Sequence, residues 1–130
     1  DPSLHVGCYA FTSAGTFQGA KSVCQNKGGS LVGEDSVYQQ RSLAKFYKDS
    51  GRSGKVWIGA TRDISVDKWE WMYSKQSVAF NSWSTGQPNN HGGNKNCILW
   101  DGVDAWESAP CDSTSNEALC QYYGTQGEFP

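Results

Sequence analysis

The sequence predicts a single α+β domain, with helices early in the chain and strands late. Apolar residues recur at helical spacing in two segments before residue 51, whereas short apolar or alternating runs typical of strands follow residue 54. Neither an internal repeat nor a shift in composition marks a second domain. We therefore expect residues 1–130 to form one unit, with a flexible tail at 124–130.

Two amphipathic helices account for the early part of the chain. The first follows Thr16, a good N-cap residue, and stops at Gly28, so that Cys24 points inward. The second begins near residues 35–36, either of which can cap it, and ends at Gly51.

The strands are short and rich in aromatic residues. The run VWIG is continuously apolar, as expected for a buried central strand, and WEWMY alternates in the manner of a half-buried one. On these patterns we predict strands or extended segments at residues 8–11, 30–32, 56–59, 69–73, 97–100, 105–106 and 118–123.

Charge and cysteine content exclude several classes of function. A net charge of −2 without a basic run argues against nucleic acid, and nothing has the length of a membrane span. The chain opens at Asp1 without Met, which suggests a processed, secreted form. Five cysteines without a C-x-x-C motif favour disulfides in an oxidising compartment over zinc. The odd count leaves one thiol over.

The stretch QPNNHGGNKNCILWDGVDAWESAPC, residues 87–111, is the strongest functional signal. It concentrates Gln, four Asn, a His, a Lys and acidic residues between two prolines. Buried amides and charges need partners, so this stretch cannot form a core. Long polar loops on compact domains are usually functional sites, and we expect a ligand-binding loop here.

An ordered set of motifs resembles the C-type lectin domain family from about Cys8 to Tyr122. One motif alone would be weak evidence, but the order and the cysteine spacing together are specific. The set comprises Cys24, GGSLV (28–32), WIG (57–59), WEW (69–71), FNSW (80–83), QPN (87–89), NC (96–97), a Trp five residues before Cys111, and ALCQYY (118–123).

The resemblance implies a fold in which two helices pack on small antiparallel sheets beside a long polar ligand loop. It also implies the disulfides Cys24–Cys120 and Cys97–Cys111. Cys8 then has no partner within the chain. We expect it to link two copies into a homodimer, with a free thiol as the alternative.

Sugar-binding members of the family hold calcium in this loop, and the resemblance places the corresponding positions at Gln87, Asn89, Lys95, Glu107 and Ser108. The first two offer uncharged oxygens, while Lys95 stands where an acidic ligand belongs. Calcium prefers several carboxylates, so we expect no metal cofactor. We expect instead that the Lys95 ammonium pairs with Glu107. The family's auxiliary calcium site also loses acids, at Arg62 and Val66.

These observations predict a carbohydrate-binding lectin that acts without calcium, in agglutination or innate recognition of glycans. Gln87 and His91 slightly favour galactose or N-acetylgalactosamine. A calcium-dependent lectin and a non-sugar interaction protein (protein-binding, toxin-like or mineral-matrix) are the alternatives. An enzyme is not expected, because no nucleophile–base pair or carboxylate pair is evident. The predicted sugar-binding residues are Gln87, Asn89, His91, Lys95, Asn96 and Glu107.

Overall fold

The computed structural model describes residues 8–89, 94–112 and 115–122. Two helices and seven strands follow one another within these ranges, in the α+β arrangement that the sequence predicts. In chain order they are β1 (Cys8–Phe11), α1 (Phe17–Asn26), β2 (Ser30–Leu31), α2 (Val37–Asp49), β3 (Val56–Asp63), β4 (Lys68–Trp71), β5 (Cys97–Trp100), β6 (Trp106–Ala109) and β7 (Leu119–Tyr122).

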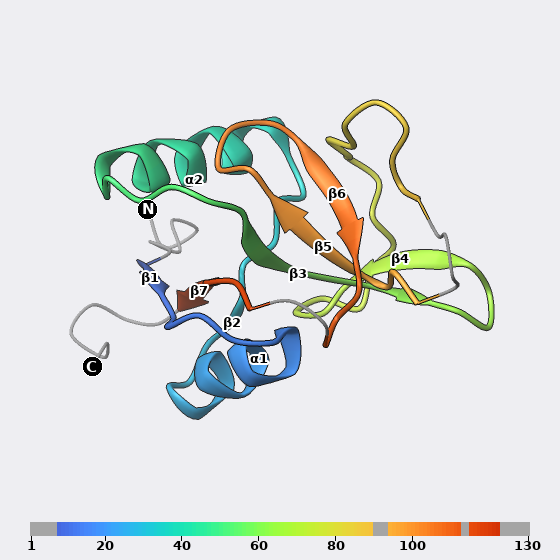
Figure 1. Cartoon of the computed structure of the whole chain (residues 1–130), viewed down its shortest axis with the longest axis horizontal. Helices are drawn as coiled ribbons and strands as arrows, with labels where there is room; N and C mark the ends of the chain where they lie inside the picture. Colours follow the sequence, from blue (N-terminus) through green and yellow to red (C-terminus); the bar gives the residue numbers. More distant parts are fainter. Residues whose placement is uncertain (1–7, 90–93, 113–114, 123–130) are drawn as a thin grey trace.

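The strands form two antiparallel sheets. One has the order β1-β7-β2 and the other the order β4-β3-β5-β6. Figure 1 shows α1 beside the smaller sheet and α2 along the β5–β6 end of the larger one. The segment between β4 and β5 leaves the larger sheet on the side away from β1 and β7 (Figure 1).

Both helices begin at the predicted N-caps. The Thr16 hydroxyl accepts a hydrogen bond from the backbone N–H of Gly19 at 3.2 Å, and Ser36 does the same for Gln39 at 3.1 Å. Each bond satisfies a backbone donor that the first helical turn leaves free. After α1 the chain turns through Gly28 at φ 84°, a left-handed conformation that favours glycine.

Two strands are longer than predicted. β3 continues past Gly59 to Asp63, and β6 runs to Ala109. In both cases the added residues are largely polar (TRD in β3, ES in β6), so the apolar pattern used to predict strands does not extend to them. They stay extended because β4 and β5 supply the backbone partners.

Two clusters of buried side chains form the core. One lies between α1 and the sheets and includes Phe17, Trp57 and both disulfides; the other lies between α2 and the larger sheet. The predicted bridges Cys24–Cys120 and Cys97–Cys111 are both present, with sequence separations of 96 and 14 residues. They join α1 to β7 and the start of β5 to the segment after β6.

A close backbone contact at Gly59 joins the two sheets. Its N–H donates to the Val32 carbonyl at 2.7 Å, and a Cβ on Gly59 would lie 2.7 Å from the Leu31 carbonyl oxygen. We expect Gly59→Ala to lower the free energy of unfolding by about 2 kcal/mol, because the backbones must separate. Urea denaturation measures this change. Gly15→Ala is the control, since nothing lies within 4 Å of the added Cβ; equal effects would contradict the prediction.

Within the described ranges, neither helix has the length and apolar character needed to cross a membrane.

Candidate functional site

The segment that leads into the polar loop is anchored on β6. The N–H of Trp106 donates to the Ser82 carbonyl at 2.9 Å, and the N–H of Ser84 donates to the Trp106 carbonyl at 3.0 Å. The Trp83 ring stands nearly perpendicular to the Trp106 ring, with centroids 5.5 Å apart. These contacts fix the point at which the chain enters the QPN triplet.

Ser108 holds the triplet in place. Its N–H donates to Oε1 of Gln87 at 3.0 Å, and its Oγ accepts from the N–H of Asn89 at 2.8 Å. The same hydroxyl lies within donating distance of Gln87 Oε1, at 2.9 Å, and of the Asn89 carbonyl, at 2.6 Å. A hydroxyl has one proton to donate, so these two acceptors share it. The Gln87–Pro88 peptide between them is cis.

The predicted ion pair between Lys95 and Glu107 is wrong. Glu107 forms its ion pair with Lys55, in the segment that leads into β3. Successive residues of a strand face opposite sides of the sheet, so Glu107 lies on the side of Leu99, its partner in β5, while Ser108 lies on the side of Ile98. Ser108, and not Glu107, therefore faces the triplet.

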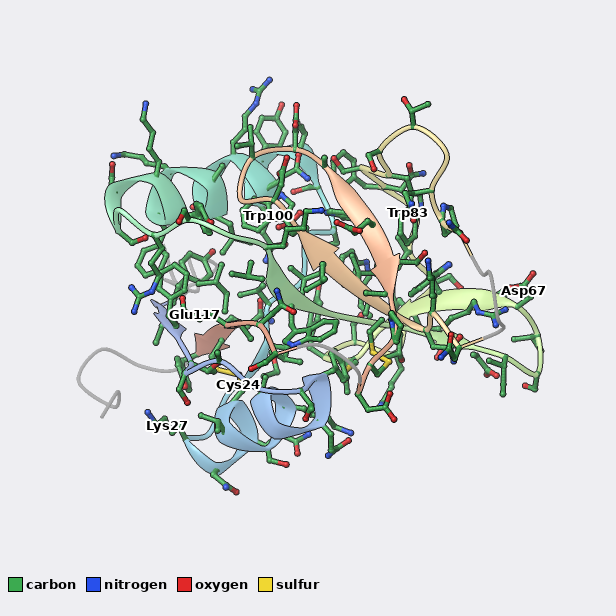
Figure 2. The ribbon with its side chains drawn as sticks, viewed as in Figure 1. Cys24, Lys27, Asp67, Trp83, Trp100 and Glu117 are labelled. Carbon is green, nitrogen blue, oxygen red and sulfur yellow. A yellow bond between two sulfur atoms is a disulfide. The ribbon has the colours of Figure 1, made fainter. Side chains whose placement is uncertain are left out.

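Asn96 has a structural partner. Its Oδ1 accepts from Arg62 Nε and its carbonyl from the Arg62 N–H, both at 3.0 Å. Arg62 Nη1 also pairs with Asp67 at 2.6 Å, beside the exposed tip of the β3–β4 hairpin that carries Asp67 in Figure 2. Arg62, one of the two positions at which the resemblance implies the loss of an auxiliary calcium ligand, is thus engaged by Asn96 and Asp67. Lys95, which is half-buried, makes no ion pair or hydrogen bond with any described residue.

The described side chains do not match the shell that calcium prefers. Gln87 already has its oxygen engaged by Ser108, and Lys95 brings a positive charge. Residues 8–89, 94–112 and 115–122 contain no group of three or more His, Cys, Asp or Glu side chains that could hold a metal ion. A calcium site would need several negatively charged oxygens here.

A buried carboxyl group supports the site from beneath. Glu34 is fully buried between β2 and α2, where its Oε1 accepts from Trp106 Nε1 at 2.8 Å and from Gln40 Nε2 at 2.9 Å. Burial raises the pKa of Glu34 from 4.5 to about 7, although these two hydrogen bonds act in the opposite direction; Asp101 adds a smaller rise. Trp106 therefore connects the loop to a group that titrates near neutrality.

The predicted site residues are thus brought together only in part. Gln87 and Asn89 meet at Ser108, whereas Asn96 is held by Arg62 and Glu107 by Lys55. His91, the tail 124–130 and the side chain of Cys8 lie outside the described residues. Sequence reasoning placed Ser108 at a calcium-ligand position but gave it no role in sugar binding, and it missed Glu34. The alternation of side chains along the strand after Trp106 could have indicated that Ser108 faces the loop. Nothing in the sequence indicated that Glu34, a charged residue next to Asp35, is buried.

Comparison with known proteins agrees with this fold. The lectin C-type domain family matches residues 13–122. Human C-type lectin domain family 4 member G is 28% identical over 123 residues, which are 92% of this chain and 40% of that protein. The chain therefore spans about two fifths of that relative's length.

Two solved structures show the same architecture. The cow C-type carbohydrate-recognition domain of CD23, solved in the presence of a GlcNAc2Man3 oligosaccharide, superposes with a TM-score of 0.78 at 28% identity and covers 92% of this chain and 89% of its own. Human lithostathine gives 0.80 at 27%, covering 91% and 92%.

The chain belongs to the C-type lectin domain family. Proteins with this fold are generally binding proteins and not enzymes.

Proposed function

We propose that the domain is a lectin that binds terminal sugars of glycoconjugates through the 87–108 segment and does so without calcium. The observation that carries this proposal is the set of hydrogen bonds by which Ser108 holds Gln87 and Asn89. It fixes the backbone of Asn89 and turns the Gln87 oxygen inward, so the Gln87 amide N–H2 has no partner among the described residues. An amide donor held in a fixed position suits sugar hydroxyl oxygens. Lys95, six residues after Asn89 in the same segment, supplies an ammonium that makes no ion pair or hydrogen bond with a described residue.

Calcium independence is supported by the chemistry of the loop. In the metal-dependent mode, oxygens from the triplet and nearby carboxylates would face one cation. Here the Gln87 oxygen is satisfied by two donors and Glu107 is paired on the other side of the sheet. Asn96 is likewise committed to Arg62. We therefore expect direct hydrogen bonds to the sugar to replace coordination.

The remaining features of the proposal follow the same binding role. We propose galactose or N-acetylgalactosamine as the favoured sugar class, with His91 against the apolar face of the ring. We also propose an extracellular protein that acts in agglutination or glycan recognition, as a homodimer linked through Cys8. A shallow single site binds weakly, and two linked sites gain avidity on a multivalent surface.

Glycan-array binding in calcium and in excess chelator tests the proposal. We expect equal binding in both buffers. Ser108→Ala should reduce binding by about five- to thirtyfold. The hydroxyl holds the Asn89 backbone and contributes one of the two hydrogen bonds to Gln87, and its loss is an effect of roughly 1–2 kcal/mol. Ser53→Ala, on an exposed loop, is the matched control. Binding that vanishes in chelator would refute calcium independence, and no binding in either buffer would refute the lectin function.

A further inference from the structure

The tryptophans of this chain are not all core residues. Four of the six are at most 2% exposed: Trp57, Trp71, Trp100 and Trp106. Trp69 and Trp83 are packed on the core but keep part of their surface in solvent. Figure 2 shows the contrast between Trp100, near α2, and Trp83, on the loop side of β6. Exposed indole surface is costly, so a pair of such residues at one place indicates a contact surface.

The two partly exposed rings pack against each other. Their centroids lie 5.0 Å apart with an interplanar angle of 59°. Trp83 is fixed from behind by Trp106, and Trp69 lies on β4, where its carbonyl accepts from the N–H of Val78 at 2.9 Å and its backbone pairs with Arg62. Neither indole N–H donates a hydrogen bond to a described residue. A ligand could therefore contact both rings and both indole N–H groups without displacing a hydrogen bond between the indoles and a described residue.

These rings lie in a groove of about 310 Å³ with a polar rim. The rim carries one ammonium, one hydroxyl and one amide, all on exposed residues, and no carboxylate is among the described residues that line it. The lining residues are Lys68, Trp69, Ser77, Val78, Asn81 and Trp83. Aromatic faces surrounded by groups that can donate hydrogen bonds match the chemistry of a pyranose ring, which has an apolar C–H face and hydroxyl groups around its edge. A purely apolar partner would leave the rim and the indole N–H groups unpaired.

We propose that the Trp69–Trp83 groove is a second saccharide subsite, in which one sugar ring stacks on the indoles and Asn81 bonds its hydroxyls. The inference rests on the proposed lectin function for its ligand class, but the groove shares none of its lining residues with the Gln87–Ser108 site. Trp83 precedes Gln87 by only four residues in the sequence. The subsite should therefore favour oligosaccharides over single sugars.

Nuclear magnetic resonance of the six indole N–H groups tests the subsite. The folded protein is titrated with galactose, lactose, mannotriose and chitotriose, and Trp69→Phe and Trp83→Phe assign the two groove signals. We expect a trisaccharide or disaccharide to shift these two signals and leave those of Trp57 and Trp100 in place. Trp69→Ala and Asn81→Ala should each weaken oligosaccharide binding, the former about tenfold. Tyr38→Ala, an exposed aromatic on α2, should not.

The outcomes separate the two sites. Shifts at the groove indoles that persist in Ser108→Ala support the subsite. Shifts confined to the backbone amides of Gln87, Asn89 and Ser108 overturn the subsite and leave the proposed function standing. No saccharide-dependent shift at either place overturns both. Indole shifts caused by a proline-rich peptide but by no saccharide would also overturn the subsite. Because Asn81 is exposed and outside the core, its variant remains informative even if Trp69→Ala does not fold.

Discussion

Replacing Cys24 and Cys120 together with alanine is expected to remove about 4–5 kcal/mol of stability. The bridge closes a loop with a sequence separation of 96 residues, and in the chain-entropy account such a loop gives the unfolded chain much freedom when it is opened. A domain of this size has only about 5–15 kcal/mol in total, so the variant should be close to unfolding at 37 °C. Urea denaturation followed by near-ultraviolet circular dichroism measures the loss.

The second disulfide provides the matched control. Cys97→Ala with Cys111→Ala opens a loop with a separation of only 14 residues, for which the same account gives about 3 kcal/mol. Cys97, like Cys24, is fully buried, so the packing loss on these two sides is comparable. A larger loss for the Cys97–Cys111 variant than for the Cys24–Cys120 variant would contradict the loop-length argument.

The second large effect concerns Glu34, whose contribution to the stability of the fold should increase on acidification. The pKa of Glu34 is about 7 in the fold and close to 4.5 when the chain is unfolded. Above about pH 7 the folded state holds a buried charge that the unfolded state solvates easily. As the pH falls from 7 towards 4.5 the folded state takes up this proton first, so the contribution of Glu34 to the free energy of unfolding rises, by about 3 kcal/mol in total.

Glu34→Gln isolates this contribution. The amide keeps an acceptor for Trp106 and Gln40 but does not titrate. The stability of the wild type minus that of the variant should therefore increase by about 2.5 kcal/mol between pH 8 and pH 5. Thermal or urea unfolding at a series of pH values gives this difference. Ser53→Ala, which removes no titratable group from an exposed loop, should show no comparable trend. A constant difference for Glu34→Gln would mean that the buried carboxyl ionises at its ordinary pKa.

The sequence was most informative where a local signal had a single physical meaning. Thr16 is a good N-cap and Gly28 a good stop, so α1 could be placed to within a residue or two. The pairing of the cysteines came from the family resemblance and proved right. Strand ends were harder, because the polar residues of β3 and β6 are held extended by neighbouring strands and not by their own pattern.

The candidate site was predicted less well, since it depends on which way side chains face. Counting residues from the cysteines placed Glu107 at one of the family's ligand positions. It could not show that Glu107 pairs with Lys55, 52 positions earlier in the chain. The same limit applies to Asn96, whose partner Arg62 comes from another strand. Glu34 is the clearest case: only the tertiary structure places a tryptophan N–H and a glutamine amide around it.

The pairing of β1 with β7 affects how the domain can be displayed. Cys8 lies opposite Tyr122 in the small sheet, so the described chain enters and leaves the domain at neighbouring points. Figure 1 shows this edge on the side opposite the segment between β4 and β5, which carries Trp83 and Gln87. A tether attached at either end would therefore hold both proposed sugar sites facing away from the support, so a surface immobilised through one terminus presents them in a common orientation to glycans in solution.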